Sequence, residues 1–162
     1  MGVVVLGIGN LLMSDDGVGV RLLQWMEEHF APHPEVVLLD GGTAGLALLP
    51  RLVGAEALLI LDAVRSDHPP GTVIFLEGKA VPARFTAGLT PHQSGVADLM
   101  AAMLLEGSLP PHAAVVGVVP QRVSLGWELS PAVASSLPEA AARAVSWLDE
   151  LGWTLAPVGS QP

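Results

Sequence analysis

Five short apolar runs constrain the fold of this chain more than any other feature of its sequence. They occupy residues 3–6, 36–39, 57–61, 72–76 and 114–119. Within each run apolar residues follow one another almost without interruption, whereas a strand with one wet face would alternate apolar and polar residues. The pattern is typical of strands that are buried on both faces, as in a parallel sheet covered by helices.

Three amphipathic stretches supply the helices that such a sheet needs. Apolar positions recur at helical spacing over residues 18–26, 96–104 and 137–148. Before the last stretch, Ser136 stands three residues ahead of Glu139, which predicts a capping box at the helix start. We therefore predict an α/β fold with one three-layer domain over residues 1–153, built on a twisted, mostly parallel sheet with helices on both faces. Residues 154–162 are expected to form a flexible tail.

The composition excludes several classes of protein. With 7 basic and 16 acidic residues the formal charge is −9, which disfavours binding to nucleic acid phosphates. The absence of cysteine excludes disulfide scaffolds, iron–sulfur clusters and thiol nucleophiles. Although the mean hydropathy is +0.54, no run approaches the ~18 apolar residues of a spanning helix, and the first residues lack a basic flank. We expect a cytoplasmic protein that binds neither nucleic acid nor a membrane.

Acidic residues follow the ends of three predicted strands. Asp16 lies in the segment after the first run, Asp40 ends the second run and Asp62 ends the third. Because ligands bind at the carboxyl ends of the strands in open α/β sheets, these side chains are candidates for one site. Each aspartate could instead cap a turn or a helix. Taken together, like charges at one edge favour a bound cation or a shared proton over three separate caps.

His92, in the loop before residues 96–104, completes this group of candidate ligands. Carboxylate oxygens combined with an imidazole suit Ni²⁺, Zn²⁺ or similar ions. A dinucleotide site is a weaker interpretation, since Leu12 replaces the third glycine of the fingerprint and Asp15 with Asp16 would repel a pyrophosphate. No Gly-x-Ser-x-Gly elbow supports a serine nucleophile, whereas paired aspartates can share a proton and activate water.

The order of the motifs adds a further signal. The motifs occupy residues 7–12, 15–19, 40–45, 62–64, 70–72, 92–93, 116–121 and 129–133, and so cover nearly the whole chain. In this order they resemble the hydrogenase maturation endopeptidases, which process the large subunit of nickel–iron hydrogenases. The resemblance implies an endopeptidase that removes a C-terminal extension from the precursor large subunit after nickel has been inserted. It also implies a metal site formed by Asp16, Asp62 and His92, which receives nickel presented by the precursor and accepts other divalent metals in its place.

The expected catalytic set is Asp16, Asp62 and Asp40, with a water nucleophile that is polarised by a metal or activated by a carboxylate. Asp16 is expected to be the more important carboxylate and Asp40 an orienting neighbour. Three alternatives stay open: a metal-independent aspartic-type peptidase, a non-catalytic nickel-sensing chaperone for the precursor, and a nucleotide-binding protein. Trp127 and the loop around Met13 are expected either to form an apolar surface for a partner or to cover the edge of the core.

Overall fold

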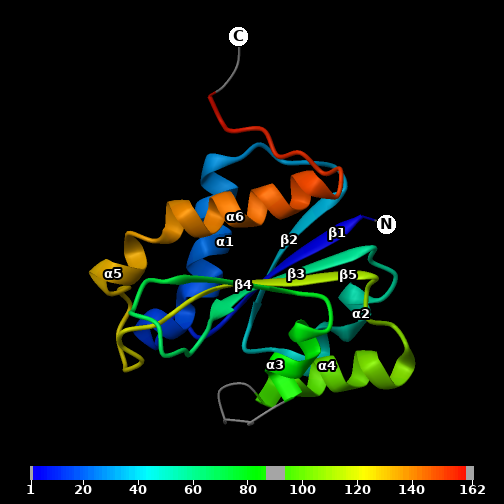
Figure 1. Cartoon of the computed structure of the whole chain (residues 1–162), viewed down its shortest axis with the longest axis horizontal. Helices are drawn as coiled ribbons and strands as arrows, with labels where there is room; N and C mark the ends of the chain where they lie inside the picture. Colours follow the sequence, from blue (N-terminus) through cyan, green and yellow to red (C-terminus); the bar gives the residue numbers. More distant parts are fainter. Residues whose placement is uncertain (1, 87–93, 160–162) are drawn as a thin grey trace.

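The computed structural model describes residues 2–86 and 94–159, and it confirms the predicted α/β fold. Helices cover both faces of a five-stranded sheet in three layers (Figure 1). The strands are β1 (Val3–Ile8), β2 (Val36–Gly42), β3 (Ala57–Ala63), β4 (Val73–Glu77) and β5 (His112–Val118). The α-helices are α1 (Val18–His29), α2 (Leu49–Leu52), α3 (Ala80–Thr86), α4 (Ser94–Glu106), α5 (Pro131–Ala134) and α6 (Leu137–Glu150), and the 3-10 helices are η1 (Ser14–Gly17) and η2 (Gly45–Leu48).

The sheet has the strand order β2-β1-β3-β5-β4. Four strands are parallel, and β4 runs antiparallel to β5. Residues 64–72 contain no helix that would carry the chain back to the other edge, so β4 starts at the carboxyl edge and runs in the opposite direction. Because β1 and β3 are parallel neighbours, the residues that follow these two strands meet at one edge of the sheet.

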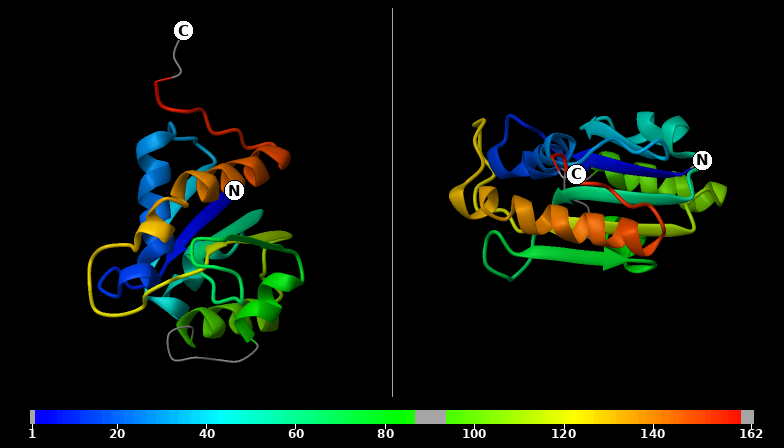
Figure 2. Two further views of the ribbon diagram at one scale, coloured as in Figure 1. Left: turned by 60° about the vertical axis from the view of Figure 1, so that its left-hand side comes forward. Right: turned by 90° about the horizontal axis from the view of Figure 1, so that it is seen from above.

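Each face of the sheet buries its own apolar core. Helices α1 and α6 lie on one face and α3 and α4 on the other, as the two views of Figure 2 show. Alternate residues of β3 reveal the division, since Leu59 and Leu61 pack toward α1 and α6 while Leu58 and Ile60 pack toward α3 and α4. Asp62 follows Leu61, so the pleat directs it to the face covered by α3 and α4.

The start of α6 differs from the predicted capping box. Ser136 is the N-cap residue, but its hydroxyl donates to the carbonyl oxygen of Val133 at 2.6 Å and makes no capping bond. The backbone of Ser136 is helical (φ −87°, ψ −11°) rather than extended, because only Ser135 separates it from the end of α5. The side chain is therefore directed back to α5 and not forward to the amide of Glu139.

The short helices η2, α2 and α3 were not predicted, because so few residues contain too few turns to show a helical period. Among the described residues, no helix is both long enough and apolar enough to cross a membrane.

Residues 154–158 lie against the segment that leaves α1. The N–H of Ala31 donates to the carbonyl of Ala156 at 2.8 Å, and the N–H of Val158 donates to the carbonyl of His29 at 2.9 Å. Leu155 is buried in the core beside α1. The sequence predicts a flexible tail over residues 154–162 and does not predict these contacts. Their partners are more than a hundred residues away in the sequence.

Candidate active site

The turn after β1 places Asp16 at the carboxyl edge of the sheet. Gly9 has a φ of 127°, and a Cβ there would overlap the carbonyl oxygen of Asp16, so the close return of the chain requires glycine. The N–H of Asn10 donates to Oδ2 of Asp16 at 2.9 Å, which orients the carboxylate. Asp16 is partly exposed and can therefore meet a ligand from solvent.

Asp62 reaches the same edge from β3. Its Oδ1 accepts the N–H of Ala63 at 2.8 Å, and the side chain is only partly exposed. The first turn of α1 lies so close to β3 that a Cβ at Gly19 would overlap the carbonyl oxygen of Leu61. This close approach therefore requires glycine. With glycine at this position, η1 contacts β3, and Asp16 is brought near Asp62.

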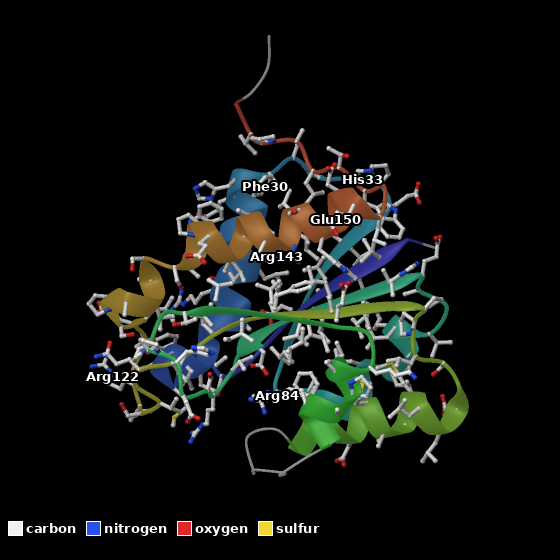
Figure 3. All side chains as sticks on the ribbon, viewed as in Figure 1. Phe30, His33, Arg84, Arg122, Arg143 and Glu150 are labelled. Atoms are coloured by element: carbon white, nitrogen blue, oxygen red, sulfur yellow. The ribbon has the colours of Figure 1, made fainter. Side chains whose placement is uncertain are left out.

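The pKa of Asp62 is raised to about 8. Burial is the largest cause, and the negative charge of Asp16 raises this pKa further. The hydrogen bond from the N–H of Ala63 and the positive charge of Arg84 act in the opposite direction. Arg84 belongs to α3, on the lower side of the sheet in Figure 3. At neutral pH Asp62 therefore keeps its proton in the folded protein.

Asp16 and Asp62, hereafter the aspartate pair, thus form one electrostatic unit. Two carboxyl groups that hold one proton can accept a proton at one oxygen and donate a proton from another. The same oxygens can also bind a divalent cation once the proton is released. Both kinds of chemistry were predicted from the sequence for this edge of the sheet.

Asp40 is not brought together with the aspartate pair. It is exposed, and its Oδ1 accepts the N–H of Gly42 at 3.0 Å. It is in register with Gly7 of β1, which in turn is in register with Leu61 of β3. The pleat therefore assigns Asp40 to the face covered by α1 and α6, opposite to the face of Asp62.

Asp15 anchors the turn that bears Asp16, and the sequence does not reveal this role. Its side chain is fully buried, and its two carboxylate oxygens accept four hydrogen bonds. The donors are the N–H groups of Gln121, Arg122 and Ser130 and the hydroxyl of Ser130, at 2.7 to 2.9 Å. Burial raises the pKa of Asp15, but the donated hydrogen bonds outweigh it, so the pKa is lowered overall. Asp15 thereby fastens η1, and with it Asp16, to the loop over residues 120–130.

His92 lies outside the described residues. Among the residues that are described, no group of three or more His, Cys, Asp or Glu side chains could hold a metal ion. The aspartate pair alone thus supplies two carboxylates but not a complete ligand set.

A cavity of about 280 Å³ lies at the other end of the molecule and contains neither member of the aspartate pair. It is lined by Met26, Glu27, Phe30, Ala31, Pro32, His33, Val36, Leu38 and Leu155. Figure 3 shows Phe30 and His33 far from Arg84 and Arg122, which lie toward the carboxyl edge. The candidate active site is therefore an open edge of the sheet, not this cavity.

Comparison with known protein sequences gives consistent matches along the chain. The model of the family described as HycI, hydrogenase maturation protease, matches residues 20–147. The hydrogenase 2 maturation protease of Escherichia coli strain K12 is 37% identical over 153 residues, which are 94% of this chain and 93% of that protein. The hydrogenase expression/formation protein HupD of Rhodobacter capsulatus is 43% identical over 93% of this chain and 72% of its own length.

Solved structures agree with the sequence matches. The hydrogenase maturating endopeptidase HybD from Escherichia coli superimposes with a TM-score of 0.94 at 35% identity, and the match covers 99% of this chain and 100% of that one. The [NiFe] hydrogenase maturation protease HybD from Thermococcus kodakarensis has a TM-score of 0.75 at 30% identity, over 91% of this chain and 99% of that one.

Proposed function

The chain belongs to the family of hydrogenase maturation proteases, and from this premise we propose that it removes the C-terminal extension of a nickel-loaded precursor, the large subunit of a nickel–iron hydrogenase. The observation that carries the proposal is the aspartate pair at the carboxyl edge of the sheet. A peptidase without cysteine and without a serine elbow needs groups that activate water, and the pair supplies them.

Nickel enters the proposal as part of the substrate. Asp16 and Asp62 offer carboxylate oxygens, and His92 is assigned as the third ligand on the basis of the family resemblance. This donor set suits nickel and also zinc or similar divalent ions, which are expected to substitute. We propose that the precursor holds the metal and that the protease completes its coordination. Cleavage then depends on nickel insertion.

Hydrolysis is assigned to a water molecule at the aspartate pair. One carboxylate takes a proton from the water as the water oxygen attacks the carbonyl carbon of the scissile amide. The C–N bond then breaks, and the leaving amine receives a proton from the pair. Asp16 is the proposed base, because its carboxylate is partly exposed and is oriented by the N–H of Asn10. Asp40 lies on the opposite face of the sheet from Asp62. We assign it to orienting a part of the substrate chain that does not react.

The raised pKa of Asp62 also favours a second mechanism for the same function. A metal-independent aspartic-type dyad would use a protonated Asp62 and an ionised Asp16 and would not need His92 or nickel. A non-catalytic nickel-sensing chaperone would use the same edge to bind the precursor without changing its mass.

Intact mass spectrometry separates these mechanisms. Purified precursor large subunit from the same organism is mixed with the protein, once nickel-loaded and once nickel-free. Shortening of the loaded form alone is the expected result, and the His92→Ala variant should then lose this activity. Shortening of both forms would replace the nickel-dependent mechanism by the aspartate dyad. Precursor that is bound but never shortened would refute the protease assignment in favour of the chaperone.

A further inference from the structure

An exposed apolar surface lies beside the aspartate pair. It consists of Leu12, Leu125 and Trp127, which are 45%, 84% and 64% exposed, and we call it the platform. Resting on the function proposed above, we infer that the platform binds apolar side chains of an extended precursor segment next to the scissile bond. All three side chains are exposed to solvent, so burial in the core does not account for them.

Backbone hydrogen bonds hold the two halves of the platform together. Met13 and Gly126 form a parallel bridge. On its two sides, the N–H of Ser14 donates to the carbonyl of Gly126 at 2.9 Å, and the N–H of Gly126 donates to the carbonyl of Leu12 at 2.8 Å. The apolar side chains therefore project from an ordered backbone and not from a free loop.

Side chains add two further restraints. The hydroxyl of Ser14 donates to the carbonyl of Ser124 at 2.8 Å, and Nη2 of Arg21 donates to the carbonyl of Trp127 at 2.8 Å. A surface that is already ordered loses less conformational entropy when a partner binds. Trp is enriched among the residues that dominate the binding energy of interfaces, and exposed apolar patches mark interaction sites.

The platform is continuous with the candidate active site. Leu12 precedes Asp16 by four residues in the same turn, and Asp15 ties that turn to the loop that bears Leu125 and Trp127. The position of the platform relative to Asp16 is thus fixed by buried hydrogen bonds. A polypeptide whose amide bond reaches Asp16 can therefore place neighbouring side chains on the platform.

The size of the platform argues for a peptide segment and against a second copy of the chain. Three side chains expose at most a few hundred Å², whereas each partner in a stable interface buries about 800 Å². One extended segment that places one or two apolar side chains on the platform fits this area, and the remaining affinity would come from the contacts at the aspartate pair.

The test compares a double variant, Leu125→Ala with Trp127→Ala, against Leu105→Ala. Leu105 is 89% exposed on α4, outside both the platform and the active site, and so is a matched control. Both substitutions in the double variant leave the backbone hydrogen bonds of the platform in place. Thermal unfolding should show the same Tm for all variants, within about 2 °C.

Binding and cleavage are measured separately with nickel-loaded precursor. In an Asp16→Asn background, the double variant should weaken the Kd by about tenfold or more. In the active background, its KM should rise by a similar factor while kcat stays within about twofold. The Leu105→Ala control should match the parent protein in both assays.

The outcomes distinguish the platform from the proposed function. If the parent protein cleaves the precursor and the double variant has the same Kd and KM, the platform assignment is wrong and the protease assignment stands. If the parent binds without cleaving, the protease assignment fails, and the Kd of the double variant still decides the platform. If the parent protein neither binds nor cleaves, both fail. Concentration-dependent dimerisation that the double variant abolishes would assign the platform to self-association and overturn the inference.

Discussion

Replacing Asp62 by asparagine should make the protein more stable, and increasingly so as the pH rises. The folded protein retains the proton of Asp62 up to a pKa of about 8, whereas the unfolded chain releases it near the ordinary aspartate pKa of 3.8. Between these values the folded state binds more protons than the unfolded state, so the free energy of unfolding of the wild type falls as the pH increases. Asparagine does not ionise, and its side-chain oxygen can still accept the N–H of Ala63. The free energy of unfolding of the Asp62→Asn variant therefore does not decrease in this way.

The size of the effect follows from proton linkage. A group that is protonated in the folded state and ionised in the unfolded state changes the free energy of unfolding by about 1.4 kcal/mol per pH unit. From pH 5 to pH 7 the advantage of the variant should therefore grow by up to about 3 kcal/mol. Partial solvent access to Asp62 makes this an upper bound. For a chain of this length, 3 kcal/mol corresponds to a rise of about 6–12 °C in Tm.

Urea unfolding at pH 5, 6 and 7 measures the difference between Asp62→Asn and the wild type directly. Asp40→Asn is the matched control, because Asp40 likewise accepts a backbone N–H but is exposed to water. It shows what the loss of a carboxylate that accepts a backbone N–H costs at an exposed position. A difference for Asp62→Asn that does not change with pH would refute the reasoning, since Asp62 would then ionise alike in the folded and unfolded states.

Three further predictions concern the residues around the aspartate pair. Asp16→Asn should abolish cleavage of the precursor, with a loss of about 100-fold or more, and should lower the pKa of Asp62 in a carboxyl carbon NMR titration; unchanged cleavage would contradict the assigned base. Asp15→Asn should lower the free energy of unfolding by about 2–4 kcal/mol at neutral pH, because its amide group faces N–H donors. This deficit should shrink as the pH falls below about 4, because the unfolded chain then binds a proton at Asp15 whereas the folded protein, in which the pKa of Asp15 is lowered, does not; a deficit that stays constant down to pH 2 would contradict the lowered pKa. Gly19→Ala should destabilise the protein by about 2 kcal/mol or more in urea unfolding, because the added methyl group meets the carbonyl of Leu61, and a stability equal to wild type would show that α1 can move away from β3.

The sequence predicts those features of the fold and site that depend on residues close together in the chain. Apolar runs locate all five strands, and the rule for the carboxyl ends of parallel strands brings Asp16 and Asp62 to one edge. The role of Asp15 could not be predicted, because its hydrogen-bond partners follow it by 106 to 115 residues. No local pattern encodes such contacts. In the printed sequence Asp15 and Asp16 are alike, and only the structure shows that one is a buried anchor and the other a partly exposed carboxylate.

The placement of Asp40 could not be predicted for a different reason. A strand end reveals which edge of the sheet a residue reaches, but its face depends on the pairing register. In β2 this register is regular up to Asp40 and shifts between Gly7 and Ile8 of the neighbouring β1. Asp40 and Asp62 therefore share an edge without sharing a face.

The topology explains why the chemistry concentrates between β1 and β3. From β1 the chain passes through α1 to β2 on one side, whereas β3 lies on the other side of β1. The strand order therefore reverses direction between β1 and β3, and ligands of open α/β sheets bind at the carboxyl ends of the strands at such a switch point. Asp16 reaches this switch point on η1 and Asp62 on β3, so the two acids can meet without belonging to one helix or loop. Asp15, one residue earlier, fastens the same turn to the loop that carries Trp127. A single buried carboxylate therefore links the group assigned to hydrolysis with the surface assigned to substrate binding.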